Sequence, residues 1–556
     1  MKFKDMPYKR VDFEETGKKF NDLEHALDEA ESAKEQLAVH EKYYELTSHV
    51  TTQMTLAEIR HDIDTQDAFY QKEQDFYDEN RPVFRNLCVS YQRKLYQSPF
   101  RDELEEKIGK VAFKNIELGM KSVDPSILDL MQEENALETQ YNELLSTAKI
   151  DWYGEVLNLS LMNPYLNSKN RNVRKEAWEA YTQFFADHKE ELDDLYDRLV
   201  KNRTQQGQRM GYDNYLPLGD ARMVRNCYTR NDMAEFRKHV KKDFVPFTQK
   251  LEEKKRRRLN VSHLYYFDEG VYFPQGNPCP EGIPEEILEA GRKLYHELSP
   301  ETGQFMDFMC DNELFDVLGR KTKKTGGYMT YLPDFGSPFI FANFNGTTSD
   351  VDVITHECGH AFQWYLVKDD PIREHWDITM ETAETHSMSM EFFTEPWMDL
   401  FFGNRADDYV AMHFEDAMIF IPYGTMVDEF QEIMYQNPSL SPKERNNVWL
   451  DLEKQYRPHM DYQGNSYWEA GGFWQKQHHI YDCPLYYIDY CIAQVNALQY
   501  RIWMKKDWDK AWQSYLKLCR LSASDFFHGL IRKAGLLNPF EDGCLAYMVR
   551  CLEEEI

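Results

Sequence analysis

The sequence lacks the features that place a protein in a membrane or outside the cell. Its 556 residues contain no apolar run near the roughly 18 residues that a membrane helix needs. The first twenty residues, MKFKDMPYKRVDFEETGKKF, have no apolar segment of the kind found in secretory signals. Ten cysteines are scattered along the chain without a CxxC pair, a pattern typical of reduced thiols. We therefore expect a cytoplasmic protein without a membrane partner.

Positive charge is also scarce. Lys and Arg number 65 against 95 Asp and Glu, which gives a formal net charge of -30 at pH 7. This excess of negative charge argues against nucleic acid and against anionic membrane surfaces as partners. The basic run Lys254–Arg258 is expected to be a solvated helix end. Hydrophobic residues make up 42% of the chain, enough for a large core.

Glycine and proline are sparse between about Asn21 and Ala148, where Glu, Lys, Gln, Leu and Ala dominate. This composition predicts long amphipathic helices that serve as a scaffold. Helix breaks are expected near Thr51–Thr55, Arg81–Pro82, Ser98–Pro99 and Asp124–Pro125.

The composition changes between Thr325 and Thr348, where the sequence is TGGYMTYLPDFGSPFIFANFNGTT. Tyr, Phe, Gly and Pro replace the helix formers. We expect a small β-sheet here, with one strand near Tyr328–Tyr331 and another near Phe339–Phe344. Such a strand could hold an extended peptide by β-addition, or it could be a hairpin of the core. The sequence leaves both interpretations open.

The segment VDVITHECGHAFQWYL directly follows the expected sheet and contains an HExxH motif. In a helix, His356 and His360 lie one turn apart on the same face and can share one metal ion. Glu357 beside them can act as the general base on a water molecule in the open coordination position. The alternative, a buried helix with two hydrogen-bonded histidines, leaves the Glu357 carboxylate in apolar surroundings without a partner. Cys358 points off the metal face and is expected to be a packed thiol.

Zinc needs a third protein ligand, and a glutamate from a later helix is one known solution. The segment Asp377–Phe393, DITMETAETHSMSMEFF, is expected to be such a helix and offers Glu381, Glu384 and Glu391 near one face. One of them could bind the metal while another orients an imidazole. Spacing alone does not choose among the three. His386 is a weaker candidate because it lies off that face.

Aromatic residues gather between Tyr467 and Tyr490, around a Gly-Gly pair and two adjacent histidines. Gly471 and Gly472 permit a mobile loop. A tyrosine hydroxyl or a histidine in this segment could stabilise the oxyanion when water attacks an amide carbonyl. An aromatic core with hydroxyl groups at its edge is the alternative for any single tyrosine.

Three blocks in order resemble the thimet oligopeptidase and oligoendopeptidase F family of zinc metallopeptidases, especially its shorter bacterial oligoendopeptidases. They are Phe339–Gln363, Glu381–Phe393 and His479–Tyr490. Weaker similarity begins near Asn163. Cys358 departs from the family pattern, where we expect a residue without a thiol, and is a candidate for sensitivity to oxidation.

The resemblance implies a role for each matched residue. His356, His360 and Glu384 would bind one Zn2+ per chain, and Glu357 would be the base and proton shuttle. Glu381 and Glu391 would support a ligand histidine. The remaining catalytic candidates fall in the family's substrate loop and are His479, Tyr487 and Tyr490. The sequence does not fix the register of this loop. His478 competes with His479, and Tyr481 and Tyr486 are neighbouring tyrosines.

The resemblance also implies a fold. It would be mainly α, a gluzincin-like zincin with two helical lobes around a deep substrate channel and a small β-sheet beside the HExxH helix. Residues 1–162 would form a helical N-terminal lobe that is one wall of the channel, and residues 163–556 the catalytic region. Such a channel admits short unfolded peptides and excludes folded proteins.

The implied activity is that of a zinc metalloendopeptidase that hydrolyses internal bonds of short oligopeptides by Glu-assisted attack of zinc-bound water. A dipeptidyl carboxypeptidase of the same fold is an alternative, but the sequence identifies no group that would grip a free C-terminal carboxylate. A peptide-binding protein without catalysis and a helical scaffold without zinc are further alternatives. Cleavage specificity and oligomeric state stay open.

Overall fold

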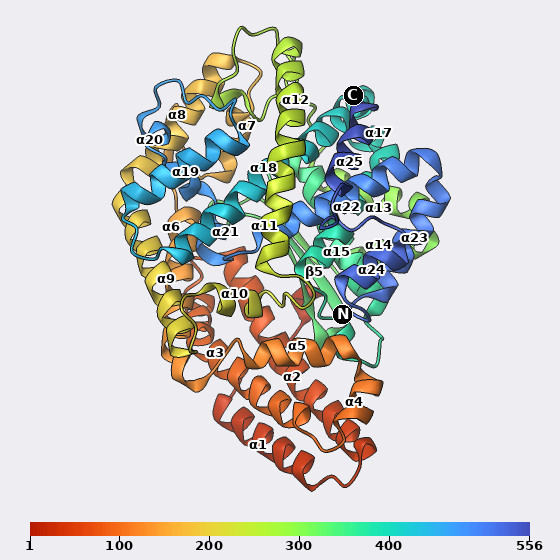
Figure 1. The fold of residues 1–556 in the computed structure, drawn as a ribbon. Helices are drawn as coiled ribbons and strands as arrows, with labels where there is room; N and C mark the ends of the chain where they lie inside the picture. Colours follow the sequence, from red (N-terminus) through yellow and green to blue (C-terminus); the bar gives the residue numbers. More distant parts are fainter.

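The computed structural model describes residues 1–556, and helices form most of it (Figure 1). A two-stranded and a three-stranded sheet are the only β-structure. No helix has both the length and the apolar character required to span a bilayer. The expectation of a mainly α fold is confirmed.

Long helices build the N-terminal part, and the first five of them lie at the lower end of Figure 1. They are α1 Phe13–Glu29, α2 Ala33–Ile63, α3 Ala68–Tyr96, α4 Arg101–Ile108, α5 Lys110–Met120 and α6 Leu128–Ser146. The first five share a core of their own, in which Phe20, Tyr43 and Tyr91 are buried. Helix α6 instead packs Leu137 and Tyr141 into the large core of the remaining chain. The lobe boundary at residue 162 stays a prediction.

The rest of the chain is also mostly helical and lies largely above α1 to α5 in Figure 1. Its first helices are α7 Asn163–Leu166, α8 Arg171–Asp187, α9 Lys189–Arg209, α10 Leu216–Arg222, α11 Arg230–His239, α12 Val245–Arg258, α13 Pro284–Leu298 and α14 Pro300–Asp311. The later ones are α15 Ser349–Val367, α16 Met380–Phe393, α17 Asp399–Phe402, α18 Ala406–Gln436, α19 Pro442–Tyr456, α20 Ser466–Glu469, α21 His479–Asp482, α22 Tyr487–Lys506, α23 Trp508–Leu521, α24 Phe527–Ala534 and α25 Cys544–Glu553.

Two of the four expected helix breaks are wrong. Helix α2 runs unbroken through Thr51–Thr55, and α3 runs through Pro82. Thr52 and Pro82 are both buried, so tertiary packing outweighs the low intrinsic helix propensity of these residues. The breaks at Ser98–Pro99 and Asp124–Pro125 are confirmed, since no α-helix includes those residues.

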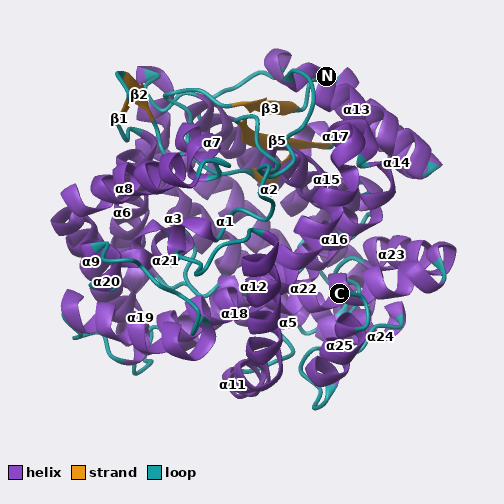
Figure 2. Ribbon diagram, turned by 90° about the horizontal axis from the view of Figure 1, so that it is seen from above, coloured by secondary structure: helices purple, strands orange, loops and turns teal.

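The three-stranded sheet contains both expected strands. Strand β5, Ser337–Phe344, is central and fully buried along most of its length, with β4, Tyr328–Leu332, antiparallel to it. Strand β3, Phe315–Leu318, pairs in parallel on the other side of β5 and was not predicted, nor was the hairpin of β1, Ile150–Trp152, and β2, Glu155–Leu157. Figure 2 shows β5 beside α15. Because β5 is paired on both sides, the free edges of this sheet belong to β3 and β4, and either could take up another strand.

Helices α15 and α16 approach each other very closely at Gly359. A Cβ atom built on Gly359 would lie 2.6 Å from Cα of Ser387 and 3.0 Å from the His386 carbonyl oxygen, both on α16. These neighbours are backbone atoms of a buried helix and cannot move aside easily. Glycine at this position therefore sets the distance between the two helices.

Replacing this glycine tests how tightly the pair is packed. Gly359→Ala is expected to lower the free energy of unfolding by about 1–3 kcal/mol, because the methyl group must push α15 away from α16. Gly17 of α1 is the matched control, since nothing lies within 4 Å of its added Cβ. Gly17→Ala should raise stability by roughly 0.5–1 kcal/mol. Denaturant unfolding followed by circular dichroism measures both, and equal effects of the two substitutions would contradict the packing account.

Candidate metal and catalytic site

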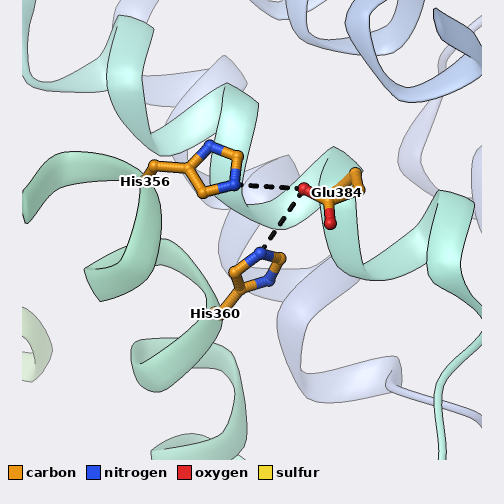
Figure 3. A group of neighbouring side chains, drawn as sticks. All are labelled: His356, His360 and Glu384. Atoms are coloured by element: carbon orange, nitrogen blue, oxygen red, sulfur yellow. Dashed lines mark ion pairs between the residues drawn. The ribbon is translucent and has the colours of Figure 1, made fainter. Parts of the chain in front are cut away.

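Two histidines of α15 and one glutamate of α16 converge on a single point (Figure 3). The Nε2 atom of His356 lies 3.2 Å from Oε2 of Glu384, and the Nε2 atom of His360 lies 3.4 Å from the same oxygen. The helical spacing of His356 and His360 places both rings on the face of α15 that meets α16. Of the three glutamates that the sequence offered, the structure brings Glu384 to the histidines.

The separations from Glu384 fit a tetrahedral zinc ion. With metal–ligand bonds of about 2.0–2.1 Å, tetrahedral ligand atoms are separated by about 3.3–3.4 Å. The two separations from Glu384 match this value. Burial alone would raise the pKa of Glu384, but His360 and His356 outweigh it and hold the pKa well below its usual range. Glu384 is therefore an anion, as a carboxylate ligand must be.

Further hydrogen bonds fix the orientation of these side chains. Ser387 donates to Oε2 of Glu384 at 2.9 Å, and the Tyr486 hydroxyl donates to Oε1. On the other side, Nδ1 of His356 lies 2.6 Å from Oε1 of Glu391, whose second oxygen lies 2.6 Å from Nε2 of His413. Glu391 therefore bridges His356 to α18 and leaves the Nε2 atom of His356 directed at Glu384.

Glu381 lies elsewhere, although it is on the same helix. Its carboxylate accepts hydrogen bonds from Thr379 at 2.6 Å and from Tyr228 at 3.3 Å. Neither ligand histidine is among its hydrogen-bond partners. The supporting contact expected of Glu381 and Glu391 is thus made by Glu391 alone. His386, the weaker candidate, is fully buried and packs against the ring of Tyr515.

A cavity of about 710 Å³ opens over the three converging side chains. Its floor includes His356, Glu357, His360 and Glu384, and one wall is strand β4. The opposite side comes from the N-terminal helices, through Gln92, Asn115 and Asn142 among others. The cavity is therefore lined both by the N-terminal helices and by the later part of the chain. Cys358 is fully buried and faces away from it.

The aromatic loop contributes a second set of polar groups to this cavity. His479, Tyr486 and Tyr490 line it, and the Tyr490 hydroxyl lies 3.4 Å from Nε2 of His479. Burial, and next the charge of His478, lower the pKa of His479 to about 3, so its ring is neutral. Tyr487 instead lines a neighbouring cavity of about 260 Å³, and its hydroxyl donates to Gln477 at 3.2 Å.

Tyr486 is the residue that the sequence reasoning left out of the site. It precedes the first residue of α22, and Tyr490 lies four positions later. The two hydroxyls therefore share one face of that helix. The spacing of Tyr486 and Tyr490 can be seen in the sequence. The contact between Tyr486 and Glu384 cannot, because it depends on how α22 packs against α16.

Comparison with known proteins agrees with this geometry. Residues 3–123 match the family model described as peptidase M3 N-terminal domain, and residues 300–549 match peptidase family M3. A solved structure titled PZ peptidase A with inhibitor 2 is 44% identical, covers 100% of this chain and 99% of its own, and superposes with a TM-score of 0.98. The chain belongs to peptidase family M3. It is a hydrolase of the metalloprotease type that acts on peptides.

More distant relatives share less of the sequence. Oligopeptidase PepF of Bacillus subtilis is 20% identical over 411 residues, which are 70% of this chain and 58% of that protein. The oligoendopeptidase-F structure from Enterococcus faecium is 15% identical, covers 98% of each chain and has a TM-score of 0.61, a likeness of fold. The resemblance drawn from three sequence blocks is confirmed, but the expected start of the similarity near Asn163 is wrong, because residues 3–123 also match the family.

The contrast between Glu391 and Glu381 can be tested by metal binding. Glu391→Gln is expected to weaken zinc affinity by about tenfold to hundredfold, because the neutral amide supports the His356 ring less well. Glu381→Gln, on the same helix, should leave the affinity within about twofold. Competition with a chromophoric chelator measures both. An equal loss in the two variants, or none in Glu391→Gln, would contradict the assigned contact.

Proposed function

We propose that the protein is a zinc-dependent oligoendopeptidase, which hydrolyses internal peptide bonds of short unfolded peptides. The convergence of His356, His360 and Glu384 beneath an inter-lobe cavity that also contains Glu357 carries this proposal. A cavity enclosed by two lobes admits an extended chain more readily than a folded domain. Membership of the M3 family supports the peptidase reaction.

The Nε2 atoms of His356 and His360 and one oxygen of Glu384 would hold the metal. When bound, zinc supplies a Lewis acid that polarises a carbonyl group and lowers the pKa of a water molecule. Glu391 keeps His356 in the tautomer that leaves Nε2 free to coordinate. Tyr486 and Ser387 hold the Glu384 carboxylate in place.

Glu357 would carry the proton through the reaction. It is 7% exposed and faces the cavity one residue from His356. Its carboxylate takes a proton from the water that attacks the scissile carbonyl and gives a proton to the leaving amine. Both proton transfers take place beside the scissile bond, so the Glu357 carboxylate alone can carry them out.

Hydrogen-bond donors above Glu357 would stabilise the carbonyl oxygen as its negative charge develops. Tyr490 projects into the cavity from α22, beside the neutral ring of His479. A phenol or imidazole N–H that already faces this position needs little reorganisation. Strand β4, which lines the same cavity, would hold the substrate backbone along its unpaired edge.

Loss of the base alone should separate binding from catalysis. Glu357→Gln is expected to keep zinc and to lower kcat for an internally quenched peptide by at least 10²–10⁴-fold. Metal content by mass spectrometry and cleavage of a peptide blocked at both ends measure the two properties. Full activity of this variant would contradict the mechanism. Failure to cleave any blocked peptide, with cleavage of free ones, would indicate the dipeptidyl carboxypeptidase alternative instead.

The two tyrosines of the loop provide a second, matched comparison. Tyr490→Phe is expected to lower kcat by roughly 10²–10³-fold with little change in KM, because it removes a donor used in the transition state. Tyr487→Phe should change kcat only a few-fold, since its hydroxyl donates to Gln477 and the residue does not line the catalytic cavity. Steady-state kinetics on one peptide decide between them. A larger loss in Tyr487→Phe would reverse the assignment.

A further inference from the structure

A second cavity, of about 280 Å³, adjoins the catalytic one. The two have four lining residues in common, Thr325, Gly326, Gly327 and His478. The first three directly precede β4, so the second cavity continues the catalytic one past that end of the strand. A peptide laid along β4 would therefore extend into the second cavity.

The second cavity contains a lysine without an anionic partner. Lys476 ends the 3₁₀ helix Gly472–Lys476, and its ammonium group lies 4.4 Å from the centre of the Phe473 ring. It forms no ion pair, in a chain whose acidic residues outnumber its basic ones. Burial, and next Arg457, lower the pKa of Lys476 to about 8, with no acidic side chain opposing them. Lys476 is half-buried, and an ammonium group that is partly removed from water gains stability when an anion meets it.

No acidic side chain of this cavity pairs with the ammonium group of Lys476. Asp350 is its one acidic side chain, and its two oxygens accept hydrogen bonds from the backbone N–H groups of Asn345, at 2.9 Å, and Gly346, at 2.8 Å. The first turn of α15, at Ser349, also lines the cavity. The positive end of that helix favours an anion there in addition to the lysine.

The direction of α15 relates this cavity to the cleaved bond. Val353 lies 3.4 Å from a Cβ built on Gly327, just before β4, while Trp364 stacks on Tyr331 near the far end of β4. Helix and strand thus run in the same direction, with the metal ligands between these two contacts. From Val353 to the middle of the metal motif is about 7–8 Å along the helix, the length of roughly two extended residues.

The positive charge of Lys476 then favours one chain direction for a peptide bound along β4. A peptide antiparallel to β4 would place its C-terminal part at Gly327 and its carboxylate near Lys476. A parallel peptide would bring its positively charged amino end to the same ammonium. The antiparallel direction is therefore the one that charge favours.

We propose that Lys476 binds a carboxylate of the substrate, two or three residues beyond the cleaved bond on the C-terminal side. This inference rests on the proposed peptidase function. The carboxylate is either the C-terminal group of a short leaving fragment or the side chain of Asp or Glu. It supplies the carboxylate-binding group that the sequence alone did not identify.

The test uses four quenched peptides of one core sequence. A free acid and an amide end three residues past the cut, and two longer amidated peptides carry Glu or Gln at that position. Lys476→Met is expected to lower kcat/KM about tenfold to hundredfold for at least one carboxylate peptide, and to leave its neutral twin unchanged. The peptide whose kcat/KM falls in Lys476→Met shows whether the bound carboxylate is the C-terminal group or the Glu side chain. Lys476→Arg should keep most of the preference, and Lys506→Met, at an exposed lysine that ends α22, should keep all of it.

Two outcomes would overturn the proposal. One is a wild-type enzyme that cleaves each carboxylate peptide and its neutral twin equally well. The other is a preference that Lys476→Met leaves intact in a variant with unchanged thermal unfolding. Calorimetric binding of the same peptides to metal-free protein keeps the inference separate from the proposed function. If no peptide is cleaved but the carboxylate preference in binding depends on Lys476, the peptidase assignment fails and the binding site stands.

Discussion

The close crossing of α15 and α16 at Gly359 is the constraint on which the site depends. Only a residue without a side chain allows the two helices this separation. The separation in turn brings imidazoles on one helix within 3.2 and 3.4 Å of a carboxylate oxygen on the other. A wider crossing would leave both histidines on the correct face of α15 with no third ligand in reach.

Buried polar groups around this crossing are arranged so that each supports another. Glu391 connects His356 to His413 on α18, and Tyr486 on α22 holds the free oxygen of Glu384. Four helices therefore contribute to the placement of the three converging side chains. Hydrogen bonds in such a network are strengthened by the large apolar core around it, and they favour one arrangement of the side chains.

The sequence predicted those parts of the site that depend on local spacing. His356 and His360 follow from the period of a helix, and β4 and β5 follow from short apolar aromatic runs between turns. The choice of Glu384 over Glu381 and Glu391 depends on how α16 is rotated against α15, which periodicity does not contain. Tyr486, unlike Tyr487, faces Glu384 because of the packing of α22. The unbroken course of α2 through its threonines likewise depends on burial by neighbouring helices.

The most direct test of the metal site is a titration of metal-free protein with zinc. At each step the number of zinc ions bound per chain and the peptidase activity are measured. The structure predicts that activity rises from near zero and reaches its plateau at one zinc per chain, and that His360→Ala removes both the binding step and the recovery. Full activity in protein shown to be free of metal, or a plateau of binding that His360→Ala leaves unchanged, would contradict the assignment of His356, His360 and Glu384.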